Sequence, residues 1–176
     1  MLKTILLIVA AAIAALLIYA ATKPDSFRLQ RSTTIAAPPD KVFALINDLR
    51  QFNTWNPFAK MDPKQVITYD AVTAGVGGAY TWQGEKSGAG RMQIAESIAP
   101  QRVSAKLDFS KPFEAHNRVD FTVKPQGDKG STVTWAMQGP MPYFFRLVTI
   151  FSDMDKTVGR DFDNGLANLK ALAEKP

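Results

Sequence analysis

The sequence predicts an α+β fold in which a curved antiparallel sheet of seven strands packs around a long C-terminal helix, preceded by one transmembrane helix. The first observation is an uncharged apolar run at the N-terminus. The second is a series of seven segments in which apolar and polar residues alternate, and the third is an apolar stripe with helical spacing over residues 142–174. The 176 residues therefore divide into a membrane segment at 1–24 and one domain at 25–176.

The apolar run covers residues 4–22 and reads TILLIVAAAIAALLIYAAT. It holds nine Leu, Ile or Val residues, seven Ala and no charge. A helix of this length reaches about 28 Å, close to the roughly 30 Å hydrocarbon core of a bilayer. Tyr19 lies near one end, where an amphipathic ring suits the membrane interface. We therefore expect a single-pass anchor, with the lipid bilayer as its partner.

A cleaved signal peptide is the alternative for the same run. Its apolar region is normally about 7–15 residues long and ends at a cut flanked by small residues. The run here is longer, and a cut after Ala21 places the bulky Tyr19 three residues before the bond. The pattern favours the anchor and leaves the signal peptide open.

The charges beside the run barely decide its orientation. Lys3 precedes it, whereas Lys23, Arg28 and Arg31 follow it, opposed by Asp25. Counting positive charges favours a domain that stays inside. A three-residue head before an apolar span is typical of a signal anchor, which exports the domain on its C-terminal side. We expect an exported, periplasmic or extracytoplasmic domain slightly more than a cytoplasmic one.

The domain opens with a strand and a helix. Residues 26–35 alternate apolar and polar side chains, which predicts a half-buried strand. The segment AAPPD at 36–40 ends it, and Pro39 and Asp40 suit a first helical turn. Residues 39–50 form the predicted amphipathic helix, and 51–58 a loop with three aromatic residues. The apolar positions of that helix are Val42, Phe43, Ile46 and Leu49.

Six further strands follow, separated by turns rich in Gly and Pro. Sequential strands joined by such short turns predict an antiparallel sheet. The predicted ranges are 64–71, 77–83, 89–98, 101–109, 116–124 and 131–138.

The last predicted element is a single helix over residues 142–174, about 50 Å long. Gly159 and Gly165 interrupt it and indicate a bend or a close approach of another group. A curved sheet wrapped around one long helix is a helix-grip arrangement. Because one helix cannot fill a strongly curved sheet, we expect a cavity between the two.

The first strand followed by AAPPDKVFALINDLRQFNTWNPF resembles the start of START-like proteins, also called the SRPBCC superfamily of polyketide cyclase/dehydrase and lipid-transport proteins. The later segments GEKSGAGRMQIAES and DFDNGLANLKALAE look similar, so the resemblance covers about residues 26–175. It implies an apolar cavity for a hydrophobic small molecule. Members range from carriers to cyclases, and no shared catalytic motif carries over to this chain. The residues that carry the resemblance are Pro38, Val42, Phe43, Trp55, Asn56 and Pro57.

Composition excludes several kinds of site. With no Cys and a single His, His116, the chain has no thiol nucleophile, disulfide, Cys-ligated zinc or multi-His metal site. We predict neither a metal nor another cofactor. Residues 25–176 carry 19 basic and 16 acidic residues, a net charge of +3 without a basic cluster, so we expect no nucleic-acid partner.

Aromatic residues are the best candidates for ligand contact, although each could instead fill the core. His116 begins a strand, which is typical of a surface position more than of a general base paired with Asp120. The acidic residues of the C-terminal helix indicate a solvated face, paired with Lys156 and Arg160. Those acidic residues are Asp153, Asp155, Asp161 and Asp163. The predicted cavity-lining residues are Trp55, Phe58, Trp82, Phe109, Phe121, Trp135, Phe144 and Phe151.

Three functions remain compatible with these patterns. The favoured one is a membrane-tethered domain that binds a hydrophobic small molecule, such as a lipid, an isoprenoid or quinone, or a polyketide-like compound. A cyclase or hydrolase acting on such a ligand is the second, and a non-catalytic regulatory scaffold at the membrane is the third. A filled core favours the scaffold, an apolar cavity favours binding, and a cavity with a buried titratable group favours an enzyme.

Overall fold

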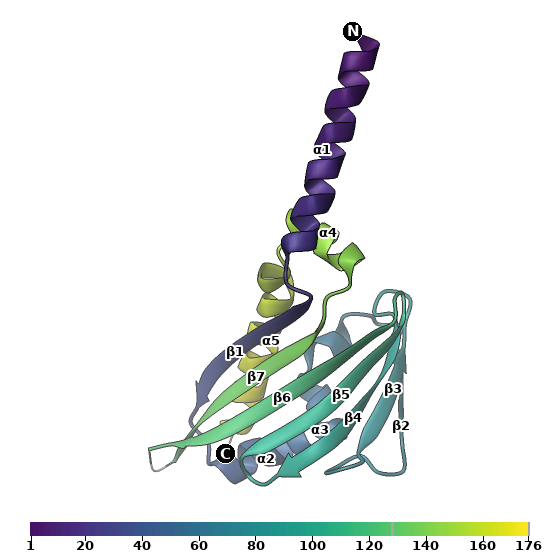
Figure 1. Cartoon of the computed structure of the whole chain (residues 1–176). Helices are drawn as coiled ribbons and strands as arrows, with labels where there is room; N and C mark the ends of the chain where they lie inside the picture. Colours follow the sequence, from purple (N-terminus) through teal and green to yellow (C-terminus); the bar gives the residue numbers. More distant parts are fainter. Residues whose placement is uncertain (128, 176) are drawn as a thin grey trace.

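The computed structural model describes residues 1–127 and 129–175 and has the α+β, helix-grip architecture that the sequence predicts. Seven antiparallel strands form one curved sheet in the order β1-β7-β6-β5-β4-β3-β2 (Figure 1). The long connection between β1 and β2 holds the first helices of the domain. The strands are β1 (Ser26–Ile35), β2 (Val66–Tyr69), β3 (Ala79–Gln83), β4 (Ala89–Ile98), β5 (Arg102–Lys111), β6 (Ala115–Gln126) and β7 (Gly130–Pro140).

The predicted helix over 39–50 is two helices, and part of the predicted loop is helical. These elements are α2 (Pro39–Asn47), α3 (Leu49–Trp55) and the 3-10 helix η1 (Pro57–Lys60). Asp48 leaves the helical conformation, with φ −102° and ψ 115°, and its carboxylate accepts the Arg50 N–H at 2.9 Å. The apolar spacing does not reveal this break, because Leu49, the first residue of α3, is buried like the apolar residues of α2.

The predicted helix over 142–174 is also divided, into α4 (Tyr143–Phe151) and α5 (Met154–Ala173). Asp153 caps α5 by accepting the N–H groups of Asp155 at 3.0 Å and Lys156 at 3.3 Å. Only α5 crosses the sheet, behind β1 and β7, whereas α4 turns toward the end of α1 (Leu2–Thr22) (Figure 1). The division decides which aromatic residues reach the interior.

The core lies between the inner face of the sheet and helices α2, α3 and α5. Trp135 of β7 stacks on Phe162 of α5, with ring centroids 4.0 Å apart and an interplanar angle of 11°. Gly165 allows this approach, because a Cβ there would lie 2.6 Å from the Trp135 ring and 2.9 Å from Pro57. Gly159 likewise leaves room for the Arg31 guanidinium. Both glycines therefore mark close approaches.

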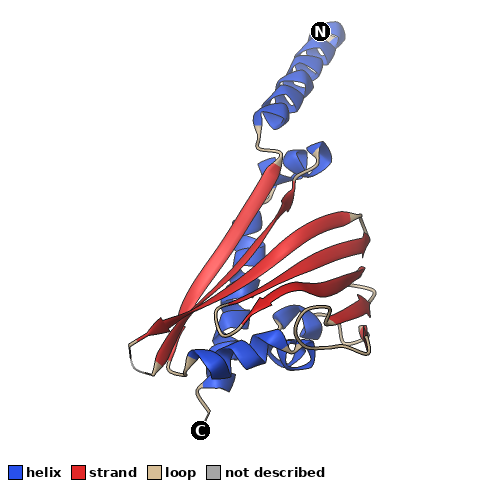
Figure 2. Ribbon diagram, turned by 60° about the horizontal axis from the view of Figure 1, so that its bottom comes forward, coloured by secondary structure: helices blue, strands red, loops and turns tan. Residues whose placement is uncertain are grey.

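Helix α1 stands clear of the sheet (Figure 2). Its most apolar window has a mean hydropathy of 2.7, and it is the one helix in residues 1–127 and 129–175 long and apolar enough to span a bilayer. The same length and composition also fit a signal sequence. Its C-terminal end contacts α4, where Ala20 is fully buried and the Tyr143 hydroxyl donates to the Leu17 carbonyl at 2.7 Å.

Candidate ligand cavity

An apolar cavity of about 210 Å³ lies between the inner face of the sheet, η1 and the first turns of α5. Strand alternation directs Tyr80 and Trp82 of β3 inward, and helical spacing places Val158 and Phe162 together on α5. Residues from every layer of the domain contribute to the wall. The lining comprises Phe52, Asn56, Phe58, Ala59, Met61, Gln65, Tyr80, Trp82, Ser87, Met92, Leu107, Phe109, Val119, Trp135, Met137, Val158 and Phe162.

Three polar side chains of this wall, those of Asn56, Tyr80 and Trp82, have partners among the described residues. The Asn56 amide donates to Asn53 at 3.1 Å, and its oxygen accepts the Phe58 N–H at 3.2 Å, which fixes the start of η1. The Tyr80 hydroxyl contacts the Met92 sulfur at 3.8 Å. Burial raises the pKa of Tyr80 far above its usual range, so its hydroxyl is neutral at physiological pH.

Two buried polar atoms of the lining residues lack partners among the described residues, the Trp135 indole nitrogen and the Ser87 hydroxyl oxygen. The other two indoles are paired. Trp82 donates to the Ser87 carbonyl at 3.2 Å, and Trp55 donates to the Leu45 carbonyl at 2.9 Å. An unpaired buried donor costs about 1–3 kcal/mol, so Trp135 offers a hydrogen bond to any acceptor that reaches it.

The cavity meets the surface beside Met61, whose side chain is half exposed. There the buried Asp62 carboxylate joins two loops, since it accepts the N–H groups of Lys86 at 2.8 Å, Ser87 at 3.4 Å and Lys64 at 3.0 Å. These backbone hydrogen bonds, those of Lys86 and Lys64 above all, lower the pKa of Asp62. The rim is therefore held by an ionised carboxylate that faces the backbone.

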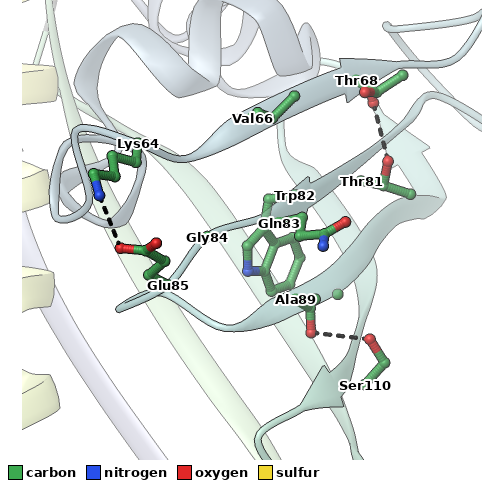
Figure 3. A pocket seen from close by; sticks show the side chains of 11 residues that line it. Lys64, Val66, Thr68, Thr81, Trp82, Gln83, Gly84, Glu85, Ala89 and Ser110 are labelled. Atoms are coloured by element: carbon green, nitrogen blue, oxygen red, sulfur yellow. Dashed lines mark hydrogen bonds and ion pairs between the residues drawn. The ribbon is translucent and has the colours of Figure 1, made fainter.

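A larger hollow of about 820 Å³ lies on the opposite, outer face of β2, β3 and β4. In Figure 3 the interactions drawn among its lining residues lie apart from one another and converge on no common point. Lys64 pairs with Glu85 at 3.2 Å, and Ser110 donates to the Ala89 carbonyl at 3.3 Å. This hollow is open to solvent and its polar groups pair with one another, so we place the candidate site in the inner cavity.

A model of the family described as polyketide cyclase/dehydrase and lipid transport matches residues 26–174. The chain belongs to this family. The match covers the whole domain and leaves α1 outside it. No curated protein matches the sequence.

Solved structures of low sequence identity share the fold of this family member. A protein from Chromobacterium violaceum is 21% identical, with a TM-score of 0.60 over 88% of this chain and 100% of that one. A hypothetical protein from Helicobacter pylori is 8% identical, with a TM-score of 0.65 over 87% of this chain and 90% of that one. Norcoclaurine synthase from Thalictrum flavum is 9% identical, with a TM-score of 0.65 over 86% of this chain and 96% of that one. At these identities the likeness shows the fold alone.

The eight predicted lining residues fall into three groups. Phe58, Trp82, Phe109 and Trp135 line the cavity. Trp55 and Phe121 point inward but lie in the packed core beside it, each 1% exposed. Phe144 and Phe151 lie on α4, with exposed fractions of 58% and 79%, because the chain breaks before α5 and carries α4 away from the sheet. Ligand contact by any of these residues stays a prediction.

Several lining residues were missed although the sequence held a signal for them. Tyr80 shares the strand parity of Trp82, and Val158 and Phe162 belong to the same helical stripe. Met61 and Gln65 had no such signal, because they lie in an irregular segment that only the fold brings to the rim.

The other candidate residues lie outside the cavity. His116 is exposed and pairs with Asp108 at 2.7 Å and Glu114 at 3.4 Å, and these contacts, the Asp108 hydrogen bond first, raise its pKa. Asp120 instead binds Ser104, Arg102 and Arg118 on the outer face. Burial opposes ionisation of Asp120, but these partners outweigh it and lower the pKa. Among the described residues no three His, Asp or Glu side chains could hold a metal ion.

The acidic residues of α5 pair mainly across to the sheet, which corrects the expected pairing along the helix. Arg31 of β1 lies 2.8 Å from Asp155 and 3.3 Å from Asp163. Along the helix, Asp153 pairs with Lys156 at 3.4 Å, and at its C-terminal end Lys170 pairs with Glu174 at 2.7 Å. Arg31 therefore fastens the start of α5 to β1.

Proposed function

We propose that this protein is a membrane-tethered binding domain for a small hydrophobic molecule held between the sheet and α5. The observation that carries the proposal is the apolar inner cavity lined by Trp135, whose buried indole N–H has no partner among the described residues. Its volume of about 210 Å³ equals about seven water molecules at ~30 Å³ each. It therefore suits a ring system or a short chain, such as the head of a quinone or isoprenoid or a polyketide-like ring, and not a whole phospholipid.

Physical chemistry favours an apolar ligand with one hydrogen-bond acceptor. Burial of about 200 Å² of apolar ligand surface gives about 5 kcal/mol before the costs of association. A carbonyl or ether oxygen beside Trp135 would satisfy the indole N–H and add specificity. A charged ligand is disfavoured, because no Lys, Arg, Asp or Glu is found among the described residues of the lining.

The same wall favours binding over the cyclase or hydrolase alternative. General acid–base catalysis needs a group that titrates near the working pH and reaches the substrate. The lining offers the phenol of Tyr80, whose pKa is raised and whose hydroxyl already faces Met92. The regulatory-scaffold alternative implies a filled core, so the cavity of about 210 Å³ disfavours it.

We assign α1 as the tether, and we slightly favour the exported side of the membrane for the domain, because a short head before an apolar span is typical of a signal anchor. The apolar run is longer than a signal peptide requires, and α1 continues to β1 through a short connection. Carbonate extraction of membranes tests the tether. An anchored chain stays in the pellet, whereas release with a new N-terminus near Lys23 would identify a cleaved signal peptide.

The binding test uses residues 25–176, freed of co-purifying material, which native mass spectrometry would first identify. We expect saturable changes in tryptophan fluorescence with quinones or isoprenoids. Val158→Phe narrows the cavity and should weaken binding about tenfold. Asn164→Phe is the matched control, because Asn164 is an exposed residue of the same helix.

Trp135→Phe tests whether the ligand accepts a hydrogen bond from the indole N–H. It removes the indole N–H and keeps an aromatic ring, so a carbonyl ligand should lose about tenfold in affinity. The same ligand without its carbonyl should be nearly unaffected. A flat titration of a folded protein across a broad hydrophobic library would refute the binding function.

A further inference from the structure

We infer that α4 and Phe113 form a membrane-contact surface, which inserts into the interfacial layer of the bilayer and turns the cavity rim toward it. Phe113 lies in the turn between β5 and β6. This inference rests on the proposed tether and deepens the proposed function, since it makes the ligand a molecule that resides in the membrane.

Helix α4 carries one charged residue, Arg146, and consists otherwise mainly of aromatic and aliphatic residues. It reads YFFRLVTIF, and none of its residues is buried. Phe113 extends the surface from the sheet side, with ring centroids 6.1 Å from Phe144 and 5.5 Å from Phe145. Clustered exposed aromatic residues are unusual on a surface that faces water and mark an interaction site. The large exposed apolar side chains of this surface are those of Phe113, Tyr143, Phe144, Val148 and Phe151.

The one charge of α4 is turned away from this surface. The Arg146 guanidinium donates to the Met141 carbonyl at 2.9 Å and to the Lys23 carbonyl at 3.4 Å. These acceptors lie in the backbone that leads into α4 and out of α1. The outward side of α4 therefore presents aromatic and aliphatic groups without a charge, as an interfacial helix does.

The contact with α1 sets the depth of α4. The Tyr143 hydroxyl binds the carbonyl of Leu17, which lies five residues before Thr22, the last residue of α1. At about 1.5 Å per residue, this contact lies about 8 Å inside the end of the apolar helix. Amphipathic helices bury their apolar side about 5–10 Å into the headgroup and acyl boundary. A bilayer that contains α1 therefore also covers α4, which decides between lipid and a protein partner.

The cavity rim lies at the same end of the domain. Ala89, at the start of β4, pairs with Lys111 at the end of β5, so the β3–β4 turn with Ser87 lies beside the Phe113 turn (Figure 1). Val158 lines the cavity from the second turn of α5, directly after α4. A molecule leaving the bilayer would meet the rim without crossing bulk water.

The absence of native cysteine makes a depth measurement direct. The full chain, reconstituted in phosphatidylcholine vesicles, would carry an environment-sensitive fluorophore at Phe151→Cys or, separately, at Phe144→Cys. The control is Val76→Cys, because Val76 is 65% exposed and lies in the β2–β3 connection at the opposite end of β3. Lipids brominated near the headgroup end of the acyl chain quench probes at interfacial depth, and iodide quenches probes in water.

We expect blue-shifted emission and bromolipid quenching at Phe144→Cys and Phe151→Cys, with iodide quenching at Val76→Cys. Iodide quenching at all three sites, or a chain that does not float with the vesicles, would overturn the inference. The double variant Phe144→Ser/Phe151→Ser should slow the uptake of a quinone from vesicles about tenfold and leave quinone binding from detergent solution unchanged. Unchanged uptake would also overturn it, and loss of binding in detergent by the unmodified chain would refute the proposed function instead.

Discussion

Two aromatic regions of this protein have similar composition and opposite environments. The cavity wall holds Trp135 and Phe162 stacked at 4.0 Å, whereas α4 holds Phe144 and Phe151, which are mostly exposed. Phe144, Phe151 and Phe162 all lie within the apolar segment 142–174. Trp135, on β7, packs against that segment. The difference arises at Asp153, which starts a new helix and turns the chain. Composition thus predicts that an apolar segment is buried, and a local backbone break determines whether it is buried in the core or, as we propose, in a membrane.

The largest expected effect compares one phenylalanine from each region. Phe162→Ala should lower the free energy of unfolding by about 3–5 kcal/mol, because it removes a fully buried ring and leaves a void under Trp135. Phe151→Ala should change it by less than about 0.5 kcal/mol in water. Urea unfolding of residues 25–176 measures both. Equal losses would mean that α4 belongs to the folded core and that the two regions do not differ.

The second prediction tests how tightly the cavity wall is packed. Gly165→Val should destabilise the domain by about 1–3 kcal/mol, because its Cβ would press on Trp135 and on the rigid ring of Pro57. Asn164→Val is the control, because it introduces the same side chain at an exposed neighbouring position of the same helix. The same unfolding experiment applies. A gain in stability for Gly165→Val would show that the wall is loose at this point.

How far the sequence predicts the fold differs between strands and helices. Alternation and Gly or Pro breaks predicted all seven strands within a few residues, since each signal is local to its strand. The helix boundaries were harder, because Asp48 and Asp153 interrupt the backbone without interrupting the apolar spacing. A carboxylate one residue before a helix is an N-cap signal, but the same residue type is common on solvated helix faces.

The candidate site shows the same limit at the level of single residues. Strand parity directs Phe109, Phe121 and Trp135 inward, but it does not distinguish the wall of a cavity from packed core. That distinction depends on Gly165 and η1, which bring Trp135 against α5 and Phe58. Trp135 was predictable as an inward residue, whereas only the three-dimensional structure shows that its indole N–H has no hydrogen-bond partner among the described residues.

The third prediction concerns the break that separates the two regions. Asp153→Ala removes the side chain that accepts two N–H groups at the start of α5 and should cost about 1 kcal/mol. Asp153→Asn keeps an accepting oxygen and should cost much less. Thermal unfolding of residues 25–176 compares the two variants. If both lose the same stability, the charge of Asp153 matters and its capping geometry does not.

The smallest expected effect lies at the edge of the membrane-contact surface, where His116 follows Phe113 by three residues. The hydrogen bond and charge of Asp108, with Glu114 nearby, raise the pKa of His116 above its ordinary value of 6.5. The charged form is therefore the one that the fold stabilises. That contribution is fully present below pH 6.5, the unfolded value, and is lost as the pH rises through the higher folded value.

Because the His116 imidazole is exposed, solvent and salt screen its interaction with Asp108, and the effect on stability is small. The unmodified domain should melt slightly above His116→Gln at about pH 5.5 and at the same temperature at about pH 9, with the difference shrinking in about 1 M salt. A larger difference at the alkaline pH than at the acidic one would reverse the sign and show that the neutral imidazole is the stabilised form.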